Sequence, residues 1–158
     1  IAKNAAQMEK LLAIKGQTTA DEFHQELGHI LYRKCGLKRE KTLLLEAIED
    51  LQKLKERFYN DLLVPGDQNG INFELEKAGR VADYLDLGIL IAKDALQREE
   101  SCGAHFRVEH QSGEGEAKRN DAKFQFVSVW AHQADGGAML HKEALHFEEI
   151  KTSERSYK

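Results

Sequence analysis

Apolar residues recur at helical spacing through most of the first hundred positions of the chain. The opening stretch, "IAKNAAQMEKLLAIKG", already has this spacing, and its Gly16 can adopt the left-handed conformation that ends many helices. We therefore expect a short first helix that stops at Gly16. Its apolar positions are Ala5, Met8, Leu11 and Leu12.

A second helix is predicted over residues 20–35. Thr19 and Glu22 have the spacing of a capping box, in which hydroxyl and carboxylate each accept a hydrogen bond from a free backbone N–H. Gly36 follows as a natural stop. The apolar face of this helix consists of Phe23, Leu27, Ile30 and Leu31.

Two longer helices follow, separated by the turn-rich stretch "VPGDQNG". The third is predicted over residues 39–63, with Glu49 and Lys53 as an outer i, i+4 pair. Its inward positions are Leu44, Leu45, Ile48, Leu51, Leu54 and Phe58. The fourth, over about residues 72–100, buries Leu75, Ala82, Leu85, Ile89, Ala92 and Leu96. Small residues along it favour close approach of a neighbouring helix: Ala78, Gly79, Ala82 and Gly88.

The pattern changes after residue 100. A polar loop, "SGEGEAKRND", precedes "FQFVSVWAH", in which Phe124, Phe126 and Trp130 share one face of a predicted strand. "QADGGAM" supplies turn residues and "LHKEALHFEEI" can return as a second strand, which predicts a β-hairpin. Because a lone hairpin is marginally stable in water, its aromatic face is expected to pack on the helices or on a partner.

Long amphipathic helices joined by short breaks pack most simply as an antiparallel bundle. The predicted fold class is therefore mainly α: an antiparallel, spectrin-repeat-like three-helix bundle. A short extra N-terminal helix precedes it, and a C-terminal extension containing a β-hairpin follows it.

Composition narrows the function classes. Lys and Arg total 23 against 27 Asp and Glu, so the net charge is -4 and a nucleic-acid partner is not expected. No apolar run approaches the roughly 20 residues that span a bilayer. Cys35 and Cys102 are too far apart to indicate a disulfide framework, which favours a reducing cytoplasm. The chain starts without Met and in mid-pattern, so we expect a piece of a longer protein.

The stretch "ESCGAHFRVEH", residues 100–110, concentrates residues that can carry chemistry. One hypothesis is a metal site formed by Cys102, His105 and His110, with a fourth ligand from His132, His141 or His146. Only one Cys-x-x-His pair is present, whereas structural zinc sites usually show two short ligand pairs. A second hypothesis makes Cys102 a nucleophile and His105 its base, which also requires a group to orient the imidazole.

A third hypothesis is a structural junction. The end of a long helix leaves backbone carbonyls without partners, and Gly103 allows an abrupt turn just after it. His105, Arg107 and Glu109 alternate, so in an extended segment they share one face and can form a polar network. The junction candidates are Ser101, Gly103, His105, Arg107 and Glu109.

Residues 100–110 also resemble a known signature. "ESCGAHFRVEH" is similar to the Ser-Arg-Gly-x-His-x-Arg-x-Asp motif near the C-terminus of succinate dehydrogenase and fumarate reductase flavoprotein subunits, above all the bacterial, menaquinone-linked type. Cys102 stands where that motif has Arg, and Glu109 where it has Asp. Three further stretches agree in order: "TTADEFHQELGHILYRKCGLKRE" with its Gly-x-x-Arg, "ELEKAGRVADYLDLGILIAKDALQREES", and the terminal "TSERSYK".

This resemblance implies a C-terminal helical domain of a flavoprotein that interconverts succinate and fumarate by hydride transfer with FAD. The implied division is a helical bundle over residues 1–100 and, over 101–158, the signature segment and hairpin tail, packed on the bundle or on the missing flavin domain. No GxGxxG occurs in the chain, so no catalytic, cofactor-binding or metal residue is assigned to it, and FAD belongs to the parent subunit.

The implied partners are the flavin domain of the same chain, an iron–sulfur subunit and a membrane quinone-reactive subunit. Through them the protein would lie in the cytoplasm, peripheral to the inner face of the bacterial membrane. Loss of the flavin domain would bare an apolar surface and favour weak self-association. A free-standing adaptor, whose grooves bind a partner helix, is the alternative from another class.

Overall fold

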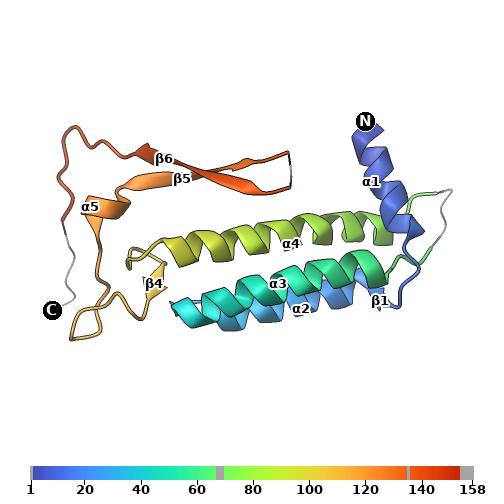
Figure 1. Cartoon of the computed structure of the whole chain (residues 1–158), viewed down its shortest axis with the longest axis horizontal. Helices are drawn as coiled ribbons and strands as arrows, with labels where there is room; N and C mark the ends of the chain where they lie inside the picture. The colour runs from blue at the N-terminus through green and yellow to red at the C-terminus, as the bar shows by residue number, and fades with distance from the viewer. Residues whose placement is uncertain (1, 67–69, 135, 154–158) are drawn as a thin grey trace.

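The computed structural model describes residues 2–66, 70–134 and 136–153. Its helices are α1 (Ala2–Ala13), α2 (Ala20–Lys34), α3 (Lys41–Asp61), α4 (Phe73–Gln97) and the short α5 (Asp121–Phe124). Its strands are β1 (Thr18–Thr19), β2 (Lys38–Arg39), β3 (Leu62–Leu63), β4 (Phe106–Arg107), β5 (Phe126–His132) and β6 (Ala138–Ala144). Helices α2, α3 and α4 run antiparallel as a bundle, with α1 at one end and the β5–β6 hairpin along α4 (Figure 1). This arrangement confirms the predicted fold class.

The local signals that start and support the helices are present. Glu22 N–H donates to the Thr19 hydroxyl at 3.3 Å and Thr19 N–H donates to the Glu22 carboxylate at 2.8 Å, so the predicted capping box forms. Lys53 and Glu49 make the predicted ion pair at 2.5 Å. Both pairs are exposed to solvent, so they favour the local helical conformation and contribute little to the stability of the whole fold.

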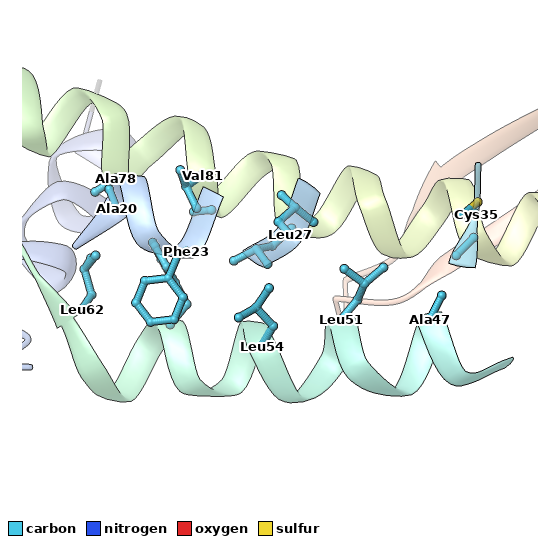
Figure 2. Packing of buried hydrophobic residues seen from close by; sticks show 14 of the residues in the cluster. Ala20, Phe23, Leu27, Cys35, Ala47, Leu51, Leu54, Leu62, Ala78 and Val81 are labelled. Atoms are coloured by element: carbon cyan, nitrogen blue, oxygen red, sulfur yellow. The ribbon is translucent and has the colours of Figure 1, made fainter. Parts of the chain in front are cut away.

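The core lies between α2, α3 and α4, where their apolar faces meet (Figure 2). Phe23 and Phe58 are fully buried and pack edge to face, with ring centroids 5.2 Å apart. Burial of each such side chain contributes about 1.5–3 kcal/mol. The α3 stripe that reaches the core is Leu44, Ala47, Leu51, Leu54 and Phe58.

Two predicted packing roles are wrong. Leu45 is 49% exposed, because it follows Leu44 by 100° around the helix and falls outside the buried stripe. Gly79 faces open space, whereas Gly88 is in close contact: a Cβ there would lie 3.1 Å from a Leu27 methyl. Gly88 therefore has the predicted role of bringing α2 and α4 together, and Ala78 and Ala82 are buried in the core as predicted small positions.

The connection from α1 to α2 is fixed by a close backbone approach. The helix ends at Ala13 rather than at Gly16, and Gly16 is not in the left-handed conformation, so that prediction is wrong. A Cβ on Gly16 would lie 1.9 Å from the Asp61 carbonyl carbon. The Asp61 carboxylate accepts hydrogen bonds from Gln17 N–H and from the Thr18 hydroxyl, beside the parallel β1–β3 pair.

The predicted hairpin forms from β5 and β6, paired antiparallel from Phe126 opposite Ala144 to His132 opposite Ala138. The prediction that Phe124 lies in the strand is wrong, because Phe124 is the last residue of α5. The centroid of its ring lies 6.0 Å from that of Phe126. The return strand stops at Ala144, so the rest of "LHKEALHFEEI" is not strand. Most of the terminal "TSERSYK" lies outside the described residues.

Candidate functional site

Arg107 is the centre of the signature segment, residues 100–110. It is 1% exposed, and its Nη1 donates to the carbonyls of Ala95 and Leu96 at 3.1 and 3.0 Å. Those carbonyls belong to the last turn of α4, where no backbone partner is available and the helix dipole is negative. The predicted end of α4 near residue 100 is therefore a few residues late, because α4 stops at Gln97 and Arg107 caps it.

Glu109 caps the opposite kind of helix end, the start of α3, where backbone N–H groups lack partners. Its Oε1 accepts a hydrogen bond of 2.5 Å from Lys41 N–H, the first residue of α3, and its Oε2 accepts one of 3.1 Å from Arg107 Nε. Burial would raise the pKa of Glu109, but these hydrogen bonds and the Arg107 charge hold it below its usual value. A carboxylate at the positive end of a helix dipole is stabilising. The segment thus matches charge to the ends of two helices.

Ser101 and Gly103 give the segment its shape. The buried Ser101 hydroxyl accepts from Arg107 N–H at 2.8 Å and donates to the Arg107 carbonyl at 3.1 Å. Cys102 and His105 exchange two backbone hydrogen bonds across a tight turn, and Gly103 supplies its positive φ of 59°. The turn points the Cys102 side chain to solvent.

His105 connects the segment to the α2–α3 turn. Its Nδ1 lies 2.7 Å from Arg39 Nη1 and its Nε2 lies 2.8 Å from the Arg98 carbonyl. Since a guanidinium can only donate, Nδ1 accepts and the proton is on Nε2, which donates to Arg98. Burial, together with the charges of Arg39, Arg107 and Arg98, lowers the pKa of His105 and keeps it neutral. The parallel β2–β4 pair, Lys38 with Phe106 and Arg39 with Arg107, holds the same connection.

The base of the hairpin is attached through Arg98 and Glu100. Arg98 donates to the carbonyls of Phe124 and Phe126 at 3.1 Å and lies over both rings. The buried Glu100 accepts from Arg98 and from Asn120 N–H, both at 2.8 Å. A buried carboxylate is tolerated here because both of its oxygens have donors.

Farther along, one hydrogen bond ties the hairpin to α4. Trp130 Nε1 donates to Asp94 Oδ1 at 2.9 Å, and Gln97 donates to the same oxygen. Burial would raise the pKa of Asp94, but these donors hold it below its usual value. The predicted aromatic face thus reaches the bundle through Phe126 and Trp130.

The residues of the other two hypotheses do not come together as a site. In the described ranges no group of three or more His, Cys, Asp and Glu side chains is arranged to hold a metal. Both ring nitrogens of His105 are already hydrogen-bonded, so it offers neither a metal ligand nor a free base for Cys102. The three candidate fourth ligands are exposed on or after the hairpin: His132, His141 and His146. The other cysteine, Cys35, lies in the core, where burial raises the pKa of its thiol.

Residues 24–157 match the family model for the C-terminal part of the fumarate reductase flavoprotein. The chain belongs to this flavoprotein C-terminal family. The fumarate reductase flavoprotein subunit of Haemophilus influenzae is 23% identical over 152 residues, covering 96% of this chain and 24% of that protein. The subunit of Helicobacter pylori is 34% identical over 117 residues, covering 74% of this chain and 15% of that protein.

Solved structures agree on the fold of this C-terminal domain. A quinol–fumarate reductase with menaquinol molecules superimposes with a TM-score of 0.80 at 24% identity, over 95% of this chain and 25% of that one. A variant of the E. coli quinol fumarate reductase gives 0.76 at 22% identity, over 97% and 25%. The chain spans about a quarter of the length of the H. influenzae subunit.

Two of the stretches that resemble family motifs meet in the fold of this domain. The Gly-x-x-Arg stretch is Gly36 to Arg39, where Arg39 Nε donates to the Gly36 carbonyl at 3.0 Å while Nη1 reaches His105. Arg39 was therefore recognisable from the motif, although nothing in the sequence places it against His105. Arg98 had no such signal, because an arginine at a helix end is commonplace.

No helix in the described part of the domain combines the length and the apolar character that crossing a membrane requires. The described strands form three two-stranded sheets, two of them parallel pairs of two residues each, and not the larger parallel sheet of a dinucleotide-binding fold. The signature segment instead forms hydrogen bonds that connect the end of α4 to the start of α3.

Proposed function

We propose that this chain is the C-terminal structural domain of a flavoprotein subunit that interconverts succinate and fumarate. The observation that carries the proposal is the family match over residues 24–157, which includes the signature segment. Hydride transfer to or from a flavin is the chemistry of the parent subunit, and FAD is bound there by its upstream part. The domain has no catalytic residue of its own and is inert without that part.

The work of this domain is to hold a rigid surface against the flavin-binding part. Arg107 and Glu109 fix the ends of α4 and α3, and His105 fixes the α2–α3 turn, so the three helices keep one register at the signature end. Ser101 and Gly103 shape the turn that makes this possible. We assign these five residues a junction role, within a division into a bundle over 1–100 and a signature and hairpin tail over 101–158.

The partners follow from the same proposal. The flavin-binding part of the same polypeptide, an iron–sulfur subunit and a membrane quinone-reactive subunit complete the assembly, and they place the domain at the inner face of the bacterial cytoplasmic membrane. The net charge of -4 does not favour a nucleic-acid partner.

Activity separates this proposal from a free-standing role. The 158-residue chain is incubated with FAD, succinate and an artificial electron acceptor, then desalted and scanned for flavin absorbance. The full-length polypeptide encoded by the natural reading frame is the matched control. We expect dye reduction and retained flavin in the full-length polypeptide only. Turnover by the short chain, or none by the full-length polypeptide, contradicts the proposal.

A further inference from the structure

A groove lies between the inner side of the β5–β6 hairpin and the side of α4 that the hairpin follows (Figure 1). It consists of two hollows, one of about 400 Å³ toward the hairpin turn and one of about 270 Å³ toward the signature segment. Leu87, Leu90 and Trp130 line both hollows. The larger one has the size of a site for a small molecule, and none of the signature residues 100–110 lines it.

The apolar walls of the larger hollow are already in place. Trp130 forms one wall from β5, and its Nε1 is hydrogen-bonded to Asp94 at 2.9 Å. Leu87 and Leu90 form the facing wall from α4, and Leu87 is still 51% exposed although the hairpin lies beside it. Because the Trp130 ring is held by its hydrogen bond, a ligand that packs on it loses little affinity to the ordering of side chains.

The charged side chains of the larger hollow leave one positive charge unbalanced. Lys55 and Asp86 form an ion pair with each other, so their charges offset. Lys93 is half-buried in the same lining, and it has no ion pair or hydrogen bond to any residue that the structure describes. An ammonium group that is partly removed from water and lacks a counter-charge favours an anion beside it.

The smaller hollow adds a hydroxyl group. Ser128 Oγ is covered from solvent and has no hydrogen bond of regular geometry within the described ranges, although it lies near the Asp94 carboxylate. Asp94 Oδ1 accepts hydrogen bonds from both Trp130 and Gln97, so this carboxylate is already engaged within the protein. A covered hydroxyl without regular hydrogen bonds is uncommon in folded proteins, and here it lines the same groove as the unpaired Lys93.

We propose that this hairpin groove binds a small organic carboxylate with an apolar body. The side chains that face the ligand are Leu87, Leu90, Lys93, Ser128 and Trp130. The apolar body packs between the Trp130 ring and the two leucines, and the carboxylate pairs with the Lys93 ammonium group. A ligand of this kind uses both the apolar walls and the unbalanced charge, whereas an uncharged analogue or a short dicarboxylate uses only one of them.

Fluorescence titration tests the proposal directly, because Trp130 is the single tryptophan of the 158-residue chain. The chain is titrated with hydrocinnamate, a carboxylate on a phenyl body, with its uncharged amide, and with succinate. We expect a saturable change in Trp130 emission with hydrocinnamate, at a Kd on the order of 1 mM or lower. The amide should bind about fivefold more weakly, the effect of one partly exposed charge, and succinate should give no change. A change that does not saturate, or equal binding of acid and amide, overturns the proposal.

A pair of variants separates the charge from the apolar walls. In Lys93→Met the acid and the amide should bind with equal affinity, because the carboxylate has lost its partner while the walls are unchanged. Lys38→Met removes an exposed lysine of β2 that lines neither hollow, so it is the matched control and should keep the preference for the acid. Circular dichroism checks that both variants fold. A preference that survives in Lys93→Met, or disappears in Lys38→Met, contradicts the proposal.

Photolabelling locates the ligand in the full-length polypeptide encoded by the natural reading frame. Para-benzoylbenzoate, a photoreactive aromatic carboxylate, is irradiated with this polypeptide, and the labelled peptides are identified by mass spectrometry. We expect labels on the α4 peptide that contains Leu87 and Leu90 and on the β5 peptide that contains Trp130, and excess hydrocinnamate should suppress them. If neither peptide carries a label that hydrocinnamate suppresses, the groove is not a carboxylate site in the parent protein and the proposal fails.

Discussion

The helical bundle and the segment that follows it bury different kinds of side chain. Among the described residues, the buried side chains between Leu11 and Ala95 are apolar. Between residues 98 and 107 the buried residues are Glu100, Ser101 and Arg107, all polar or charged. The bundle is stabilised by removing apolar surface from water, whereas the later segment is stabilised by satisfying every donor and acceptor it buries.

The two regions are expected to respond differently to amino-acid substitution. In the bundle, apolar residues of similar volume can replace one another at modest cost. In the segment, each polar group is the partner of another, so the loss of one leaves others unsatisfied. Substitutions can therefore distinguish stabilisation by apolar burial from stabilisation by buried hydrogen bonds.

The largest effect is expected from a charge in the apolar core. Leu51→Asp should unfold the chain, because an unpaired carboxylate at a fully buried site costs several kcal/mol, comparable with the stability of a whole domain. Leu45→Asp, in the same helix but 49% exposed, is the matched control and should change stability little. Circular dichroism with thermal melting measures both. A Leu51→Asp protein that melts like the wild type would refute the assignment of this face.

Arg107 tests the polar region with a change of similar volume. Arg107→Met should lower the free energy of unfolding by about 3 kcal/mol, since the Ala95 and Leu96 carbonyls and the Glu109 Oε2 atom lose the donor that Arg107 supplies. Arg107→Lys should lose less, because it keeps the charge but not the fork. Urea unfolding monitored by fluorescence gives both values. Equal stability of the Met variant and the wild type would show that the cap is not needed.

Trp130 tests the tie between the two regions. Trp130→Phe keeps a ring and removes the hydrogen bond to Asp94, so the global stability should fall by about 1 kcal/mol or less. Hydrogen exchange of the hairpin amides should accelerate selectively. Val129→Thr, on the outer side of the same strand, serves as control. If exchange is unchanged in Trp130→Phe, the hairpin is held by its base only.

His105 introduces a dependence on pH. Because its pKa is lowered in the folded chain, the unfolded chain takes up a proton first as pH falls below about 6.5, so the His105 contribution to stability is present above that pH and is lost below it. The stability advantage of the wild type over His105→Asn should therefore shrink between pH 7 and pH 5. The subtraction removes the contributions of the other histidines. A constant difference would mean that His105 keeps its ordinary pKa.

The smallest expected effect is that of metal removal. Since His105 uses both ring nitrogens, a chelator should leave the melting temperature unchanged, and elemental analysis should find no stoichiometric zinc. Cys102→Ser should behave like the wild type in the same measurement. Zinc at one atom per chain, lost together with folding, would restore the metal hypothesis.

The sequence by itself determined the bundle. The 3.6-residue repeat of α2, α3 and α4, the Thr19–Glu22 capping box and the alternation after residue 125 are local patterns, and local patterns are sufficient where one face of an element must be apolar. The resemblance of residues 100–110 likewise led to the family, because it depends on residue identity and order. Neighbouring positions such as Leu44 and Leu45 could not be separated, since both satisfy a coarse apolar pattern.

Only the tertiary structure decided what the polar residues do. Gly16 is required by the approach of the Asp61 backbone, not by its own conformation, and Phe124 leaves the strand for α5. Arg39 meets His105 across 66 positions of sequence, and Arg107 and Glu109 meet the ends of two different helices. Hydrogen bonds depend on distance and direction between groups far apart in the chain, and no repeat along the sequence encodes such a meeting.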